Sequence, residues 1–232
     1  MNVSDRFSNL QVVVTGGTGA LGRAIVSRLL AEGATCHVPS RRSPPAETPW
    51  GPDARAHIHG PVSLTDADQV AAFYDALPSV WASIHVAGGF HMGSLSEMGA
   101  DTFRGQLELN LVSAFLCLRE ASRRMGQAGG RVVNVISRPA LHPAGGMLAY
   151  STAKAGLASM TQCASEELRS GGIFVNAIAP SIIDTPNNRK SMPDADYSQW
   201  PKPEELAATV AFLASPENAV TSGALVPTFG RH

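Results

Sequence analysis

Short apolar runs alternate along this chain with longer segments in which apolar residues recur at helical spacing. The short runs are rich in β-branched side chains and predict strands. We expect strands at residues 10–14, 34–38, 81–89, 129–137, 173–180 and 224–229. The periodic segments predict helices at residues 20–30, 101–125 and 150–170, with a last helix that begins near residues 203–205.

The predicted strands are apolar along their whole length instead of at alternate positions. This pattern is typical of a parallel sheet covered on both faces, and the intervening helices supply the cover. Neither an internal repeat nor a linker rich in glycine and serine divides the sequence. We therefore predict an α/β fold over residues 1–232, a single Rossmann-type domain with a doubly wound parallel sheet and helices on both faces.

The composition is that of an ordinary soluble globular protein, with 44% hydrophobic and 16% charged residues. A net charge of −1 gives no long-range field that would attract nucleic acid or an anionic membrane. The apolar runs are too short to span a membrane, and the first residues lack a secretory signal pattern. Cys36, Cys117 and Cys163 lie far apart in apolar contexts. They favour reduced thiols and a cytoplasmic location, with a catalytic cysteine as the alternative.

A glycine-rich turn, TGGTGALG, joins the first predicted strand to the first predicted helix. Its glycines recur at three-residue intervals and permit a tight turn that a pyrophosphate can approach closely. The N-terminus of the following helix offers free N–H groups to phosphate oxygens. The residues predicted to form this dinucleotide site are Gly16, Thr18, Gly19, Ala20, Leu21 and Gly22. The alternative is a strand-to-helix turn without a ligand.

The end of the second predicted strand reads HVPSRR and bears on the choice of dinucleotide. An acidic residue at this place binds the free ribose hydroxyl of NAD, whereas arginine suits the 2′-phosphate of NADP. Ser40 stands at the position of the acid, and Arg41 and Arg42 follow it. Guanidinium groups pair with phosphate in a bidentate manner. We therefore expect NADP(H) in preference to NAD(H), although both arginines could be solvated surface charges.

Four polar residues are candidates for catalysis. Tyr150 and Lys154 lie four residues apart on one face of a predicted helix, where the ammonium group can stabilise a phenolate. Such a tyrosine can donate a proton to a carbonyl oxygen as hydride reaches the carbon. Ser137 ends a strand at the edge of the sheet where ligands bind, and Asn110 interrupts an apolar helix. For Asn110, a satisfied core or interface amide is the alternative.

Together these motifs resemble the short-chain dehydrogenase/reductase family along nearly the whole chain. The asparagine, serine and Tyr-x-x-x-Lys residues of the family match Asn110, Ser137, Tyr150 and Lys154 in order and spacing. The resemblance implies that Tyr150 is the general acid and base, and that Lys154 tunes it while holding the ribose. It implies further that Ser137 polarises the carbonyl and that Asn110 supports Lys154 through water.

The resemblance also implies cofactor contacts after the fourth and sixth strands of the sheet. The backbone after the sixth strand would lie beside the nicotinamide, and Thr185 would reach its carboxamide. The residues implied in these contacts are Ala87, Gly88, Pro180, Ile182, Ile183 and Thr185. The sequence departs from the common family pattern at Ala20, at HVAG (residues 85–88), at Ser63 and in the last residues, PTFGRH. None of these changes removes a proton-transfer group.

The expected function is therefore NADPH-dependent reduction of a small-molecule carbonyl, such as a ketone or 3-oxoacyl compound. Several segments, above all residues 184–200, also resemble dihydropteridine reductase, a branch of the superfamily that reduces a quinonoid pterin. That branch lacks the serine and the asparagine that this chain keeps, which favours a carbonyl substrate. Reduction of a pterin or quinone is the alternative. A non-catalytic regulator that senses NADP(H) is an alternative of another class.

By its position in the family pattern, the segment at residues 183–202 is expected to cover the substrate. Thr185 and Pro186 would anchor it at the cofactor, and Tyr197 and Trp200 would pack it on the body of the protein. Other residues expected at the pocket are Phe90, His91, Met92, Leu141, His142 and Met147.

The family resemblance also implies a homo-oligomer, a tetramer or dimer formed through the long helices. His57 and His59 point to one face of a predicted strand, but no third ligand follows at a familiar spacing. We therefore expect no metal site.

Overall fold

Seven parallel strands form one sheet in the order β3-β2-β1-β4-β5-β6-β7. The structure, a computed structural model, describes residues 5–53 and 55–231. The strands are β1 (Gln11–Thr15), β2 (Thr35–Pro39), β3 (Ala56–His59), β4 (Ala82–His85), β5 (Gly130–Val135), β6 (Ile173–Pro180) and β7 (Leu225–Thr228). The chain winds outward from β1 through β3 and then returns to the other side of β1, so the predicted doubly wound sheet is confirmed.

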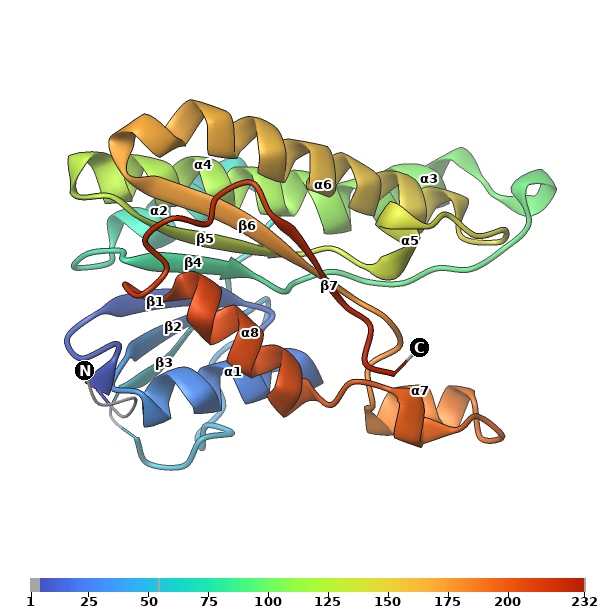
Figure 1. Cartoon of the computed structure of the whole chain (residues 1–232), viewed down its shortest axis with the longest axis horizontal. Coiled ribbons are helices and arrows are strands. Elements are labelled where there is room, and N and C mark those ends of the chain that lie inside the picture. The colour runs from blue at the N-terminus through green and yellow to red at the C-terminus, as the bar shows by residue number, and fades with distance from the viewer. Residues whose placement is uncertain (1–4, 54, 232) are drawn as a thin grey trace.

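Helices cover both faces of this sheet (Figure 1). One face carries α1 (Ala20–Ala31) and α8 (Pro203–Ala214), and the other carries α2 (Ala67–Asp75), α4 (Ser113–Met125) and α6 (Leu148–Leu168). Within β1, Val12 and Val14 pack in the core beneath α1, whereas Val13 packs in the core on the opposite face. Burial on both faces explains why the strands are apolar at every position.

Three shorter helices lie near the carboxyl ends of the strands. They are α3 (Ala100–Leu107), α5 (Arg138–Leu141) and α7 (Pro186–Ser191). The helix predicted at residues 101–125 is α3 and α4 joined by a π-helical turn at Glu108–Val112. The helix α2 was not among the elements predicted from the sequence. It begins where the Asp66 carboxylate accepts hydrogen bonds from the backbone N–H groups of Asp68 and Gln69. None of the helices among the described residues is long and apolar enough to cross a lipid bilayer.

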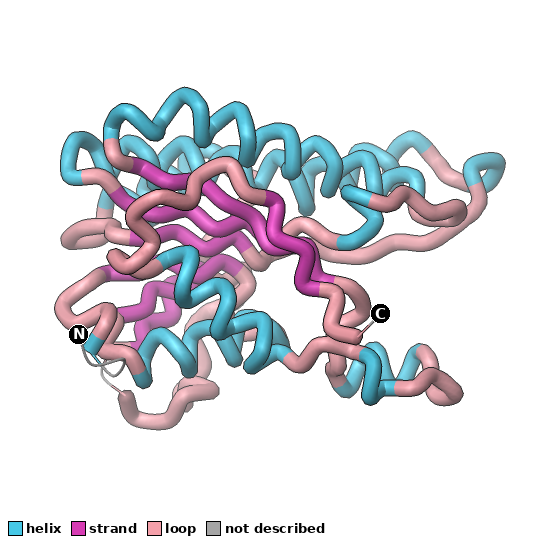
Figure 2. The backbone as a smooth tube through the Cα atoms, viewed as in Figure 1, coloured by secondary structure: helices cyan, strands magenta, loops and turns pink. Residues whose placement is uncertain are grey.

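The parallel arrangement brings the carboxyl ends of all strands to one edge of the sheet (Figure 2). The glycine turn after β1, the loop after β4, Ser137 after β5 and the segment after β6 therefore meet at this edge. The order of strands reverses between β1 and β4, which is where ligands bind in open α/β sheets.

Candidate functional site

The glycine turn after β1 leaves no room for a side chain at Gly16 or Gly22. Gly16 has a φ of +66°, and a Cβ on it would lie 2.8 Å from the backbone nitrogen of Ala87. A Cβ on Gly22 would lie 2.2 Å from the carbonyl oxygen of Gly16. Gly19 precedes α1 and has no side chain with which to cap the first N–H groups of the helix. The turn therefore fits the phosphate groups of a dinucleotide.

The predicted ribose end of the site lies beside this turn, because β1 and β2 are paired. Ser40 Oγ accepts a hydrogen bond of 3.2 Å from the backbone N–H of Arg42. The side chains of Arg41 and Arg42 are exposed and form no ion pair within residues 5–53 and 55–231. Two guanidinium groups thus follow β2 without a protein carboxylate to neutralise them.

Lys154 lies in the second turn of α6 and is buried. Its Nζ donates a 2.7 Å hydrogen bond to the carbonyl oxygen of Val135 and lies 5.9 Å from the centroid of the Tyr150 ring. Burial lowers the pKa of Lys154 to about 8. Burial also raises the pKa of Tyr150, and an interaction with Ser137 opposes that rise. Burial thus outweighs the lowering of the phenol pKa that the spacing of Tyr150 and Lys154 led us to expect.

Ser137 lies between β5 and α5 and is buried next to Tyr150. Although it acts on the pKa of Tyr150, its Oγ makes no hydrogen bond of standard geometry to any described residue. A buried hydroxyl group without a partner is costly unless a ligand or water satisfies it. The Ser137 hydroxyl is thus available to an oxygen atom of a bound substrate.

Asn110 lies in the π-helical turn, a distortion that often marks a functional site. Its amide nitrogen donates to the carbonyl oxygen of Gly89 at 3.0 Å, and its Oδ1 accepts from the Gly89 N–H at 3.1 Å. A Cβ on Gly88 would lie 2.6 Å from Asn110 Oδ1 and 3.5 Å from Lys154 Nζ. Asn110 therefore clamps the loop after β4 directly beside Lys154.

The segment after β6 contains the residues expected at the nicotinamide. Thr185 begins α7, and its Oγ1 accepts a hydrogen bond of 3.2 Å from the backbone N–H of Asn188. The side chain of Asn188 donates in turn to the carbonyl oxygen of Ile183 at 2.8 Å. The oxygen of Thr185 is thus occupied as a helix cap, while its hydroxyl proton stays free to donate. Pro180 ends β6, and Ile182 is partly exposed.

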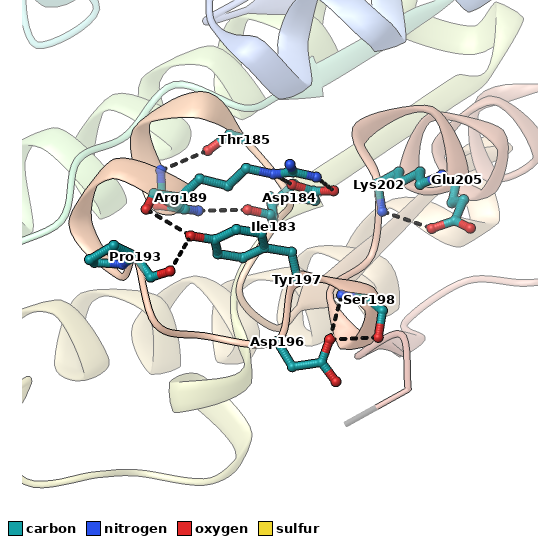
Figure 3. Close-up of polar contacts among 11 residues, drawn as sticks. Ile183, Asp184, Thr185, Arg189, Pro193, Asp196, Tyr197, Ser198, Lys202 and Glu205 are labelled. Carbon is teal, nitrogen blue, oxygen red and sulfur yellow. Dashed lines mark hydrogen bonds and ion pairs between the residues drawn. The ribbon is translucent and has the colours of Figure 1, made fainter.

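The segment at residues 183–202 is ordered by its own side chains (Figure 3). Asp184 and Arg189 form an ion pair of 2.6 Å, which lowers the pKa of Asp184. The Tyr197 hydroxyl donates to the carbonyl oxygen of Pro193 at 2.9 Å, and Arg189 lies over the Tyr197 ring. The hydroxyl and the ring of Tyr197 thus make these contacts within the segment itself. Trp200 is buried, as expected, and contacts Tyr197.

Large apolar side chains are exposed in the loop after β4, at the start of α6 and in the loop after β6, and four of them form what we call the apolar rim. Phe90 contacts Tyr150 edge to face, with 5.1 Å between ring centroids, and is 60% exposed. The other members are Met92, Leu148 and Ile182. Exposed apolar surface of this kind marks a ligand groove or an interface. His142, another expected pocket residue, packs its ring on Phe229, whereas Leu141 packs against a core cluster.

A chain of buried polar side chains, missed in the sequence, crosses the sheet behind the candidate site. The Tyr74 hydroxyl bonds Ser83 at 2.7 Å, and Ser83 bonds His85 Nε2 at 2.9 Å. His85 Nδ1 lies 2.8 Å from Asn134 Oδ1, and the Asn134 amide donates to Thr161 at 2.9 Å. Burial lowers the pKa of His85 to about 4, so this imidazole is neutral near pH 7. The network joins α2, β4, β5 and α6.

His57 and His59 share one face of β3, where they meet His37 of β2. His37 Nδ1 lies 3.0 Å from His59 Nε2, and His37 Nε2 lies 2.8 Å from Gln11 Oε1. The ring nitrogens of His37 are thus engaged in hydrogen bonds. Within the described part of the chain, no group of three or more histidine, cysteine or acidic residues is arranged to hold a metal ion.

Comparison with known proteins points to one family. The family described as short chain dehydrogenase matches residues 11–196. A cis-4-hydroxycyclohexanecarboxylate dehydrogenase from Sinomonas cyclohexanicum is 31% identical, with 98% of each chain covered. A 3-oxoacyl-[acyl-carrier-protein] reductase from Synechocystis sp. is 30% identical, with 88% of each chain covered. Among solved structures, the ligand-free aldohexose dehydrogenase of Thermoplasma acidophilum superposes with a TM-score of 0.86 at 26% identity, covering 99% of this chain and 95% of that one.

Proposed function

The chain belongs to the short chain dehydrogenase family, and from this premise we propose that it uses NADPH to reduce the carbonyl group of a small ketone or 3-oxoacyl compound. It is an oxidoreductase that acts on CH–OH or C=O groups, like the dehydrogenases and reductases that it resembles. The observation that carries the proposal is the hydroxyl of Ser137, which is buried beside the Tyr150 phenol and makes no hydrogen bond of standard geometry to a described residue.

The four candidate catalytic residues divide the chemistry between them. When bound, NADPH supplies the hydride. Ser137 donates a hydrogen bond to the substrate carbonyl and so polarises it, and Tyr150 delivers the proton to the developing alkoxide. Lys154 places a positive charge beneath the ring of Tyr150, at 5.9 Å from its centroid. Asn110 forms two hydrogen bonds to the backbone of Gly89. These bonds hold the loop at Gly88 in a fixed position beside Lys154.

The preference for NADP(H) rests on charge after β2. Arg41 and Arg42 have no ion-pair partner among the described residues, and no acid replaces Ser40. A 2′-phosphate would give both guanidinium groups the anionic partner that they lack. Relatives that reduce 3-oxoacyl chains on acyl carrier protein support the same direction of reaction. The glycine turn would hold the pyrophosphate, because its glycines let the phosphate groups approach the backbone closely.

The surroundings of the site complete the proposal. The segment at residues 183–202 covers the substrate, because it joins the nicotinamide end of β6 to α8 and is held by Trp200. The protein works as a homo-oligomer in the cytoplasm, with α4 and α6 in the contact between subunits. Reduction of a quinonoid pterin or a quinone is the second candidate, supported by the resemblance of residues 184–200 to the corresponding segment of dihydropteridine reductase.

A substrate screen tests the proposal. NADPH oxidation is followed at constant enzyme concentration with β-ketoacyl esters, aryl ketones, quinones and a quinonoid dihydropterin, and each assay is repeated with NADH. We expect turnover of ketones or ketoacyl esters with NADPH. Turnover of the dihydropterin alone would favour the second candidate, and turnover of none of these compounds would contradict the proposed function.

A further inference from the structure

Arg138 directly follows Ser137 and opens the short helix α5. Its side chain is exposed, and its guanidinium group has neither an ion pair nor a hydrogen bond to any described residue. Most of the other described arginines form ion pairs or hydrogen bonds. Arg6, Arg28 and Arg189 are examples that pair with carboxylates, and Arg131 donates to backbone carbonyl oxygens.

The Arg138 side chain is nevertheless held in place by an aromatic ring. Its Cζ atom lies 5.3 Å from the centroid of the Phe229 ring, a cation–π distance. His142, from the end of the same helix, contacts this ring with 5.9 Å between centroids. The Ser181 hydroxyl donates a 2.8 Å hydrogen bond to the backbone carbonyl oxygen of Phe229, and the Phe229 side chain packs against a buried core cluster. Two basic side chains from the segment between Ser137 and Tyr150 thus converge on Phe229.

The acid that follows β6, near Ser181, is already neutralised. Asp184 is paired with Arg189 inside the segment at residues 183–202 (Figure 3), with 2.6 Å between Oδ1 and Nε. Arg138 therefore stands beside the candidate site as an uncompensated positive charge. Its five N–H donors are free for a planar anion.

The apolar rim indicates the chemical character of the part of the ligand that does not contact Arg138. Phe90 and Met92 are 60% and 61% exposed, and Leu148 and Ile182 add further apolar surface. Such a wall favours a hydrophobic body, while a single free guanidinium group favours one anionic end. A neutral ketone would leave the guanidinium group unused.

On these grounds we propose that Arg138 binds a carboxylate group of the substrate, so that the preferred substrate is an apolar keto acid. This inference rests on the proposed function, because it assumes that the carbonyl lies at Ser137. Arg138 is the next residue in the chain after Ser137, and its guanidinium group lies over the ring of Phe229. Phe229 acts as the support that limits where the group can lie.

A matched pair of ketones tests the inference. 4-Acetylbenzoate and 4-acetylbenzamide have nearly the same shape, but only the first carries a charge. Their binding to the wild-type protein and to Arg138→Gln is measured by calorimetry in the presence of NADP⁺, and their turnover is measured with NADPH. Arg104→Gln is the control variant, because Arg104 is an exposed arginine on α3. Phe229→Leu tests the support of the guanidinium group.

We expect the wild-type protein and Arg104→Gln to bind the acid about ten- to a hundredfold more tightly than the amide, the range for hydrogen bonds to a charged group. Arg138→Gln loses this preference while its affinity for the amide is unchanged, and Phe229→Leu loses part of it. Equal binding of acid and amide by the wild-type protein, binding of neither, or a preference that survives in Arg138→Gln would overturn the inference. Binding without turnover would count against the proposed function instead.

Discussion

Lys154 is a buried ammonium group whose only hydrogen-bond partner among the described residues is the carbonyl oxygen of Val135. Burial of a charge without a counter-ion costs stability, and a lowered pKa reports that cost. We propose that this charge is kept for catalysis, where an ammonium group close to Tyr150 would favour the phenolate form during proton transfer. The site is thus built at the expense of stability.

A substitution at Lys154 measures this cost. The pKa of Lys154 is about 8 in the folded protein, below the value of about 10.4 in an unfolded chain. Between these values the unfolded chain binds more protons, so the wild-type protein gains stability as the pH rises. We expect Lys154→Met to have a free energy of unfolding about 1 to 3 kcal/mol higher than that of the wild type at pH 7, measured by denaturant titration. This difference should disappear near pH 10. Lys190→Met, in the exposed part of α7, is the control. A difference that does not change between pH 7 and 10 would contradict the assignment.

Arg41 is expected to decide between the two nicotinamide cofactors. We predict that Arg41→Ala lowers kcat/KM for NADPH by about ten- to a hundredfold, because a charge-assisted hydrogen bond to the 2′-phosphate is lost. The value for NADH, which lacks this phosphate, should change little. The measurement is kcat/KM with each cofactor for wild type and variant. Equal use of both cofactors by the wild-type protein would refute the role of the arginines.

At the scale of elements, β4, β5 and α6 are joined by buried polar side chains as well as by apolar packing. His85 bonds Ser83 within β4 and Asn134 on β5, and Asn134 bonds Thr161 on α6. Val135, the next residue on β5, accepts the hydrogen bond from Lys154. The network therefore holds in register the elements that carry the candidate catalytic residues. A fully paired polar network of this kind specifies one arrangement of its elements.

Acid should open this network. The pKa of His85 is about 4 in the folded protein and about 6.5 in an unfolded chain, so the unfolded chain binds more protons between these values. His85 then makes the protein less stable as the pH falls from 6.5 to 4, by roughly 1.4 kcal/mol for each unit of difference in pKa. We expect His85→Asn to show a flatter loss of unfolding free energy over this range, measured by urea titration. In His91→Asn, which lies outside the network, the unfolding free energy should change with pH as it does in the wild type. The same pH dependence in both variants would contradict the role of His85.

The sheet and the family motifs could be predicted because their signals are local in the sequence. Val12, Val13 and Val14 are apolar in a row because both faces of β1 are buried. The glycine turn and the spacing of Tyr150 and Lys154 are likewise set within a few residues. These features need no knowledge of distant contacts.

Other features could not be predicted because they depend on contacts between distant parts of the chain. Asn110 lies in a π-helical turn and bonds Gly89, twenty-one positions away along the chain. Arg138 is held by Phe229, a residue of the C-terminal segment. The ring of Tyr197 contacts Arg189 within its own segment, and no hydrophobic periodicity in the sequence predicts this contact. The burial that lowers the pKa of Lys154 also depends on contacts between elements that are distant in the sequence.

At the scale of the whole molecule, α4 and α6 cover one face of the sheet and present an outer surface of their own (Figure 1). Phe115 on α4 is 46% exposed, and the Arg119 guanidinium group lies 5.9 Å from its ring centroid. An aromatic residue with an arginine beside it is a frequent anchor in interfaces between proteins. The outer surface of α4 is therefore the place where we propose contact between subunits.

Sedimentation tests this assembly. We predict that the wild-type protein sediments as a dimer or tetramer of the 24.3 kDa chain. Phe115→Glu should shift the distribution towards the monomer, because a charge buried in an apolar contact is costly. Phe212→Glu, at an exposed phenylalanine on α8, is the matched control and should sediment like the wild type. A wild-type protein that sediments only as a monomer would contradict the proposed oligomer.

We propose that Tyr150 delivers the proton to a carbonyl substrate. The most direct test of this proposal is the turnover number of Tyr150→Phe with NADPH and a ketone that the wild-type enzyme reduces, with NADPH binding followed by fluorescence as the control. Loss of a general acid costs about a hundredfold to ten-thousandfold in rate. We predict a fall of at least that size with NADPH binding close to that of the wild type. A variant that reduces the ketone at the wild-type rate would contradict the account.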